Sequence, residues 1–298
     1  MTHDVSCSGL RRLVLSGIVV LLLAGWAHAQ ATKRGRQQLR EPVFRVKSVR
    51  KDQLPDGHPL GPVHASVQKG LVRFRQQVQD YSATLVKREQ VNGELLDYQF
   101  ILVKIRTERR NSQGNVVVPF SVYLKFVGPE DLKGREVLWV NGKNDGKLRA
   151  HEGGLLGILS IWLDPYGPRA LKDQRYPVTK VGIENLMLEC IHRMEAGMRV
   201  AKPAEFRVQT FKAARVDDRV CTCIQITHLT RHAQSGWHTA RVFIDEEHGF
   251  PIRYAVWDWP RQEGDPPPLL EEYTYRDIKL NPGFTDADFD HENAAYDF

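Results

Sequence analysis

The chain has 298 residues, with 42 Lys and Arg against 36 Asp and Glu, and a formal net charge of +6. About 270 residues remain once a leader is removed, which is enough for one substantial core or two small ones. No nucleic-acid-binding module is recognisable in the sequence, so we do not expect nucleic acid as a partner.

The N-terminus predicts export. Arg11-Arg12 precede an uncharged apolar run, and Ala27 and Ala29 supply the small residues of a cleavage site, so we interpret residues 1–29 as a signal peptide. The apolar run is shorter than the ~20 residues that a spanning helix needs. A retained membrane anchor and twin-arginine export are the alternatives. We expect the mature protein in the periplasm or cell envelope of a bacterium.

Residues 30–60 are typical of a basic flexible linker. Within them, segment 33–51 holds eight Lys or Arg residues against the single Glu41 and is followed by a Pro/Gly-rich stretch. Blocks of this kind are usually solvated. The functional alternative is contact with an anionic envelope surface. Residues 61–298 are then expected to form one domain.

The domain begins with a predicted helix and continues with strands. Spacings of four, four, three and four place apolar residues on one stripe of that helix: Val63, Val67, Leu71, Phe74 and Val78. The clearest strand, "PFSVYLKFVG", puts four apolar residues on one face and polar residues on the other. Those four are Phe120, Val122, Leu124 and Phe126.

The middle of the chain interrupts the strand pattern. "GGLLGILSIWLDPYGP" gathers Leu155, Leu156, Leu159 and Trp162, and apolar residues at helical spacing follow from Ile183. We interpret both segments as core helices; the alternative is a mobile apolar lid. Further strand hairpins fill the C-terminal third. Roughly nine to eleven strands with two or three helices predict an α+β protein with one antiparallel sheet, and a sheet of that size curls to leave a concave face.

The ending "YTYRDIKLNPGFTDADFD" predicts a last strand sealed by a short tail. Pro282 and Gly283 stop the strand, Thr285 offers a local capping oxygen, and Phe289 returns to the core.

Three stretches resemble the bacterial exported family known as domain of unknown function 1571: "DYSATLVKREQVNGELLDYQFILVKIR", "PFSVYLKFVGPEDLKGREVLWVNGKNDGKLRAH" and the ending quoted above. The resemblance covers about residues 64–290 and implies little beyond a fold. The strand order and the ending are also similar, more remotely, to the LolA/LolB-type lipoprotein carriers. That likeness implies an unclosed β-barrel whose helices lie over a concave, apolar side that holds acyl chains. Tyr275 and Ile278 would then belong to the last barrel strand.

One cluster could bind metal. Cys221, Cys223, His228 and His232 are soft and imidazole ligands at short spacings, although strand alternation separates the thiols from His228. Together with Cys190, the two thiols also allow a disulfide in an exported protein. We favour three buried, unpaired cysteines and no bound metal.

The sequence contains no recognisable catalytic set. No G-x-S-x-G elbow, P-loop or dinucleotide fingerprint occurs, and the adjacent carboxylates Glu271-Glu272 are expected on opposite faces of a strand. An uncharacterised hydrolase is therefore the third hypothesis, and no cofactor is expected.

We predict a monomeric, non-enzymatic envelope protein that binds an apolar or amphipathic ligand, either a lipid or the acyl chain of a lipidated protein. The alternative is a sensor or scaffold for a protein partner. The candidate groove residues are the apolar members of the clearest strand and of the middle segment: Phe120, Val122, Leu124, Phe126, Leu155, Leu156, Leu159 and Trp162.

Overall fold

A computed structural model describes residues 44–45, 57–153, 159–232 and 236–298. The predicted signal peptide lies outside these residues, as does most of the predicted linker. No helix in the described ranges is long and apolar enough to cross a membrane.

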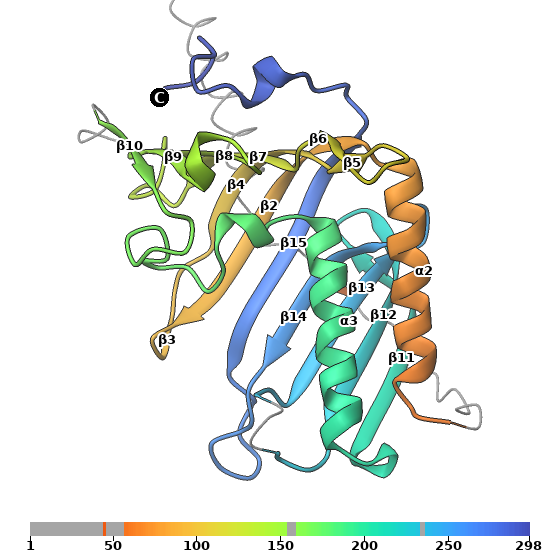
Figure 1. Cartoon of the computed structure of the whole chain (residues 1–298). Coiled ribbons are helices and arrows are strands. Elements are labelled where there is room, and N and C mark those ends of the chain that lie inside the picture. The colour runs from red at the N-terminus through yellow and green to blue at the C-terminus, as the bar shows by residue number, and fades with distance from the viewer. Residues whose placement is uncertain (1–43, 46–56, 154–158, 233–235) are drawn as a thin grey trace, which may run out of the picture. The chain divides into compact units, whose positions relative to one another are not determined.

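The domain is built on one large antiparallel sheet (Figure 1). In spatial order its strands are β1 (Phe44–Arg45), β11 (Phe206–Val216), β12 (Arg219–His228), β13 (Thr239–Asp245), β14 (Pro251–Trp257), β15 (Leu269–Leu280), β2 (Asp80–Val91), β4 (Gln99–Arg106), β7 (Ser121–Gly128), β8 (Glu136–Val140), β9 (Leu148–His151) and β10 (Ser160–Leu163). A short strand, β3 (Glu94–Leu95), pairs with β2 outside this order. β5 (Arg109–Arg110) and β6 (Val116–Val118) form a separate two-stranded sheet.

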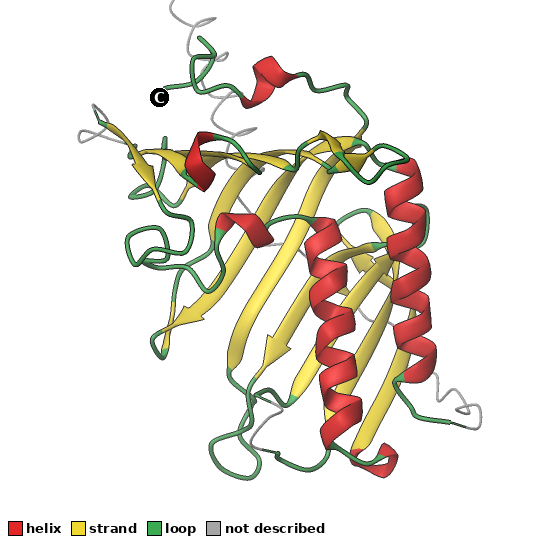
Figure 2. Cartoon of the chain, in the orientation of Figure 1, coloured by secondary structure: helices red, strands yellow, loops and turns green. Residues whose placement is uncertain are grey.

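The sheet is open and curved. Its last strand in the chain, β15, pairs with β2, so the two ends of the domain's sequence meet in the middle of the sheet. Within the described residues β1 and β10 each have a single neighbour, so the sheet does not close. Figure 2 shows the strands from β7 to β10 turning across the others. The predicted α+β class with an unclosed, curved antiparallel sheet is confirmed.

Two helices, α2 (Gly61–Gln77) and α3 (Ile183–Val200), lie on the same face of the sheet (Figure 1). The predicted apolar stripe of α2 is its buried face, and Phe74 packs edge-on against Tyr81 of β2 and Phe250 beside β14. The α3 helix buries Ile183 and Met187, as its spacing predicts. The main core therefore lies between this helix pair and the concave face of the sheet.

The helical interpretation of the middle segment is wrong where the structure describes it. Ser160–Leu163 form strand β10, in which Ile161 pairs with Ala150 and Trp162 with Arg149 of β9. A four-residue stretch with a β-branched and an aromatic residue gains little as an isolated helix but pairs readily with a neighbouring strand. Residues 154–158, which include Leu155 and Leu156, lie outside the described residues.

The C-terminal tail packs on the other face of the sheet, as Figure 1 shows beyond β7 and β8. Its turn is fixed by Asp80, whose carboxylate accepts hydrogen bonds from the backbone amides of Gly283 (3.1 Å) and Phe284 (3.2 Å). The short helix η5 (Asp286–Phe289) follows, and the Thr285 hydroxyl donates to Asp288 at 3.2 Å.

A second, smaller core forms beneath this tail. Phe289 is 5% exposed and packs in a cluster with Tyr123, Leu138 and Val140, while the ring of Tyr296 stacks on that of Tyr123 at 4.0 Å. The predicted return of Phe289 to the core is confirmed. The tail seals the outer face of the sheet and takes no part in covering its concave face.

We predict that Phe289→Ala lowers the free energy of unfolding by about 3–5 kcal/mol, because it removes a buried aromatic side chain and leaves a cavity. The exposed Glu292→Ala is the control and should change stability by less than about 0.5 kcal/mol. Urea unfolding followed by circular dichroism measures both. Equal midpoints for the two variants would mean that the tail does not seal this face.

Candidate functional site

A cavity of about 540 Å³ lies between the concave face of the sheet and its cover. The cover has two parts: α3, and the segment of residues 164–182 that connects β10 to α3, which we call the covering segment. In Figure 1 this segment passes in front of β2 and β4, beside the helix pair. The helices cover only part of the curved sheet, and the cavity occurs where the covering segment replaces them.

The cavity floor is apolar at one end. Leu85 of β2, Ile101 of β4, and Leu124 and Phe126 of β7 contribute side chains to it. They share one face because alternate residues of a strand point the same way and the register aligns Leu85 with Ile101 and Ile101 with Phe126. All four are at most 6% exposed.

The concave face becomes polar farther along the same strands. On β2 the inward positions continue from Leu85 to Lys87 and Glu89, and on β15 they continue from Tyr275 through Tyr273 to Glu271. The register pairs Tyr273 with Lys87 and Glu271 with Glu89, so both strands change character at the same level. The cavity lining is therefore amphipathic, with an apolar end and a polar end.

Glu89 is held by donors from three directions. It is 4% exposed, and it accepts hydrogen bonds from Lys87 Nζ (2.9 Å), the Tyr273 hydroxyl (2.6 Å) and the backbone amide of Arg175 (3.2 Å). Burial alone would raise the pKa of Glu89, but the charge of Lys87 and these hydrogen bonds outweigh it and lower the pKa. Glu89 is consequently ionised at neutral pH.

Glu271 is 1% exposed and joins both parts of the cover to the sheet. From the covering segment it accepts a hydrogen bond from the Tyr176 hydroxyl (2.9 Å) and pairs with Arg175 Nε (2.9 Å). From α3 it pairs with the Arg193 guanidinium at 3.0 Å. Its neighbour Glu272 points to the opposite face and pairs with Arg253, as strand alternation predicts.

Tyrosine hydroxyls of the sheet also fix the start of α3. The Tyr275 hydroxyl accepts a hydrogen bond from the backbone amide of Gly182 (3.0 Å), and the Tyr81 hydroxyl accepts one from Ile183 (2.8 Å). These two amides begin the helix and have no partner within it. Gly182 has φ 120°, and a Cβ there would lie 3.1 Å from the Tyr81 hydroxyl, so glycine suits both the turn and the close approach.

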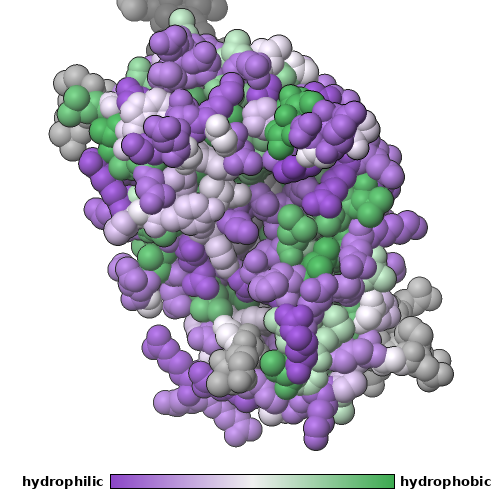
Figure 3. Space-filling view, in the orientation of Figure 1, coloured by the Kyte–Doolittle hydropathy of each residue, from purple (hydrophilic) through white to green (hydrophobic). Residues whose placement is uncertain are grey.

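The mouth of the cavity combines apolar and basic groups. Tyr166 is 62% exposed and Leu188 of α3 is 39% exposed, and the exposed side chains of Lys180 and His192 also contribute. Figure 3 shows that this face of the molecule is largely hydrophilic with separate apolar patches. The cavity thus opens to solvent through a small surface of mixed character.

The predicted groove residues divide into four groups. Leu124 and Phe126 line the cavity, whereas Val122 is buried in the core and Phe120 packs against Trp139 at 5.9 Å. Leu159 is 72% exposed, and Trp162 lies on the edge strand β10. Leu155 and Leu156 lie outside the described residues. Among the described residues, the covering segment and α3 form the cover.

Sequence reasoning did not identify the polar end of the cavity. The signal was available in "YSATLVKRE". Alternate residues of a strand share a face, so Lys87 and Glu89 lie on the same face as Tyr81, Ala83 and Leu85. Charges on the inward face of a strand that is otherwise apolar indicate buried partners. Those partners, Gln174 for Lys87 and Tyr273 for Glu89, come from distant segments and cannot be read from spacing.

The four metal candidates do not come together as a ligand group among the described residues. Cys221 and Cys223 are buried in the core, and burial raises the pKa of each thiol to about 12. His228 is 1% exposed, and its ring centroid lies 4.7 Å from that of Phe206 and 4.2 Å from that of Trp237. His232 Nε2 lies 3.3 Å from a Glu205 carboxylate oxygen. Cys190, Cys221 and Cys223 are free, buried cysteines.

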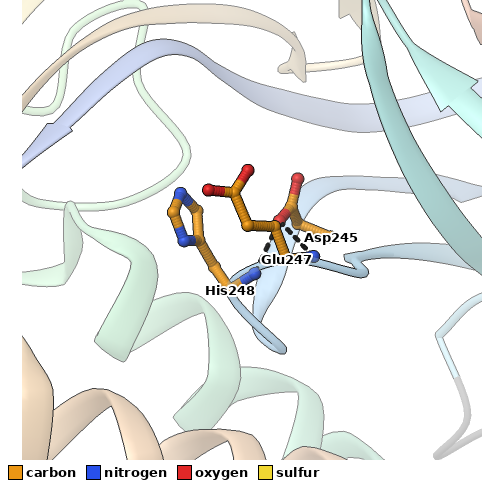
Figure 4. Close-up of side chains that lie close together, drawn as sticks. All are labelled: Asp245, Glu247 and His248. Carbon is orange, nitrogen blue, oxygen red and sulfur yellow. Dashed lines mark hydrogen bonds between the residues drawn. The ribbon is translucent and has the colours of Figure 1, made fainter.

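Another group of possible ligands lies at the tip of the β13–β14 hairpin. Asp245, Glu247 and His248 have ligand atoms within 4.8 Å of one another (Figure 4). Asp245 already accepts hydrogen bonds from the backbone amides of Glu247 (3.1 Å) and His248 (2.8 Å), and Arg219 pairs with both carboxylates. The positive charge of Arg219 disfavours a cation here, so we interpret the cluster as a turn anchor.

His228 makes stability sensitive to mild acid. Burial lowers its pKa to about 4, and neighbouring His232 and His238 lower it further in the same direction. An unfolded histidine has a pKa of about 6.5, so between these two values the unfolded chain binds a proton that the folded chain does not. The contribution of neutral His228 to the free energy of unfolding has its full value above pH 6.5. This contribution decreases as the pH drops toward 4.

We predict that His228→Phe reduces the loss of stability between pH 7.5 and pH 5, because it retains the ring contacts and removes both nitrogens. Thermal unfolding at the two pH values measures this difference. The exposed His192→Gln is the control and should keep the full difference. The explanation fails if His228→Phe shows the same pH dependence as the parent protein.

Comparison with known structures gives distant likenesses only. A complex of Pseudomonas aeruginosa MucA and MucB is 14% identical, with 77% of this chain and 61% of that chain covered and a TM-score of 0.41. An outer membrane lipoprotein-sorting protein domain from Vibrio parahaemolyticus is 12% identical over 75% of this chain and 97% of that chain, with a TM-score of 0.34. A LolA superfamily protein from Nitrosomonas europaea is 10% identical over 75% of this chain and 97% of that chain, with a TM-score of 0.31.

The family is identified by sequence. No curated protein matches the chain. The family described as "Protein of unknown function (DUF1571)" matches residues 78–298, which confirms the resemblance seen in the strand sequences and in the ending. The match spans most of the chain and all the strands that form the cavity, and the protein belongs to this family.

Proposed function

We propose that the protein binds an amphipathic ligand, a lipid or the acyl chain of a lipidated protein, in the cavity and does not transform it. The observation that carries this proposal is the cavity itself. Its volume of about 540 Å³ falls in the range of small-molecule sites, and its lining joins an apolar floor to a few fixed polar groups. An acyl chain against Leu85, Ile101 and Phe126 would gain roughly 25 cal/mol for each Å² of apolar surface removed from water.

The chemistry of the lining supports binding rather than catalysis. The described residues around the cavity include no serine, threonine or cysteine to act as a nucleophile. Two of the cavity's three carboxylates, Glu89 and Glu271, already accept several hydrogen bonds from fixed partners, and the third, Glu189, pairs with Arg193. A general base must be free to take a proton from its substrate.

A protein scaffold is the second candidate function, and one observation favours it. Strand β10 pairs only with β9 among the described strands, and Leu159 beside it is 72% exposed. An edge strand can pair with an added strand of a partner. A scaffold does not require the cavity and leaves its presence unexplained, so we rank the scaffold below ligand binding.

The place of action is part of the proposal. The predicted signal peptide supports export to the periplasm or cell envelope, where lipids and lipidated proteins are present. Segment 33–51 supports attraction to an anionic surface, since each basic residue near such a membrane contributes about 1 kcal/mol.

We predict that Ile101→Trp abolishes uptake of a fluorescent fatty-acyl probe, because the larger side chain occupies the cavity. Leu102→Trp is the matched control: it is the next residue of β4, is 45% exposed, and points to the opposite face. Fluorescence titration measures uptake, and a thermal melt verifies that both variants fold.

Equal uptake by the two variants would place the probe elsewhere on the protein. Native mass spectrometry of the parent protein, purified from its own envelope, provides an independent test. If the parent protein carries no lipid and takes up no acyl probe, the proposal fails and the scaffold becomes the leading function.

A further inference from the structure

Tyr254 lies in the cavity wall and is unlike the other tyrosines around it. It is in β14 opposite Tyr273 of β15, is 3% exposed, and lies beneath α3. The hydroxyls of Tyr273, Tyr176 and Tyr275 each make a hydrogen bond at 3.0 Å or less. The Tyr254 hydroxyl makes none with any residue that the structure describes.

The Tyr254 hydroxyl lines a cavity that opens to solvent, so water can hydrate it when the cavity is empty and no described side chain competes for its proton. Phenylalanine would fill the same space but would offer a ligand no hydrogen-bond donor. Burial also raises the pKa of Tyr254 well above its usual range, so the phenol keeps its proton and is available as a donor. The hydroxyl is therefore a hydrogen-bond donor that has no acceptor among the described residues.

The Tyr254 hydroxyl is a donor without a partner among the described residues. Glu89 and Glu271, by contrast, each already engage three donors, which include Lys87, Tyr273, Tyr176 and Arg193. The Arg193 guanidinium lies 6.0 Å from the centre of the Tyr254 ring and adds positive potential. A ligand group that contributes an oxygen acceptor fits this environment, whereas a cationic head group does not.

The distance from Tyr254 to the apolar floor suits a long chain. The spatial order runs β14, β15, β2, β4, β7, so four strand spacings separate Tyr254 from Leu124 and Phe126. At about 4.8 Å a spacing, this is roughly 19 Å across the strands. Tyr275, Leu85 and Ile101 lie between the two ends.

We propose that Tyr254 donates a hydrogen bond to the acyl oxygen of the ligand, while the hydrocarbon chain crosses the strands toward Leu124 and Phe126. The acyl oxygen belongs either to a carboxylate, as in a fatty acid, or to an ester carbonyl, as in a glycerolipid or a lipidated protein. This inference rests on the proposed function and adds the chemical group that the cavity recognises and the residue that recognises it.

The test compares Tyr254→Phe with the parent protein, using three ligands in calorimetric or fluorescence titrations. Dodecanoate and methyl dodecanoate each carry an acyl oxygen, and N-phenyl-1-naphthylamine is an apolar probe without one. We expect the variant to bind at least one of the two acyl ligands about tenfold more weakly, as the loss of one hydrogen bond implies, and to bind the oxygen-free probe as before. Tyr123→Phe, on the outer face of the sheet, is the control and should change none of the three affinities.

The pattern of loss identifies the source of the oxygen. Weaker binding of dodecanoate alone assigns a carboxylate, and weaker binding that includes the methyl ester assigns the carbonyl. The melting temperature of unliganded Tyr254→Phe should be equal to or above that of the parent, because no hydrogen bond is lost.

Two results would overturn the inference while the proposed function stands. One is unchanged affinity of Tyr254→Phe for both acyl ligands; the other is an equal loss for the oxygen-free probe. If the parent protein binds none of the three ligands, the proposed function itself fails, so the two failures are distinguishable.

Discussion

Glu271 lies on the concave face of β15 with 1% exposure, and its ion pairs hold the cover on the sheet. An isolated charge at this depth would be very costly, so the carboxylate requires Arg175, Tyr176 and Arg193. Two of these residues come from the covering segment and one from α3, which means that the pairing brings both parts of the cover to one point. Removing one partner of such a buried pair typically costs about 3–5 kcal/mol. Glu271 is therefore the one side chain of the sheet that bonds to both parts of the cover among the contacts described above.

Curvature explains why there is space beneath that roof. The two helices pack over the part of the sheet around β14, where Ile183 and Met187 fill the concave side. Toward β4 and β7 the sheet turns, and a straight helix cannot follow it. The covering segment spans this region instead and is held at its edge by polar contacts with Lys87, Glu89 and Glu271. Contacts at the edge fix the segment without filling the centre, and an amphipathic cavity results.

The two faces of the sheet pack against different segments, because successive side chains of a strand point to opposite faces. On β7, Leu124 and Phe126 face the cavity, whereas Tyr123 faces the tail and stacks with Tyr296. On β15, Glu271 holds the cover, while Glu272 pairs with Arg253 on the other side. The tail thus covers the outer face, and the covering segment and α3 lie over the inner face.

The sequence by itself determined the local elements and the two faces of each strand. The stripe of α2, the alternation in "PFSVYLKFVG" and the return of Phe289 follow from periods of 3.6 and 2 and from turn residues, which are properties of short stretches. Only the tertiary structure decided that Ser160–Leu163 form an edge strand, that residues of the 164–182 segment line the cavity, and that Tyr176 and Arg193 meet Glu271. The physical reason is that Glu271 and the hydroxyls of Tyr81 and Tyr275 bond to partners 78 to 102 residues away in the chain, and periodicity carries no information about contacts of that range.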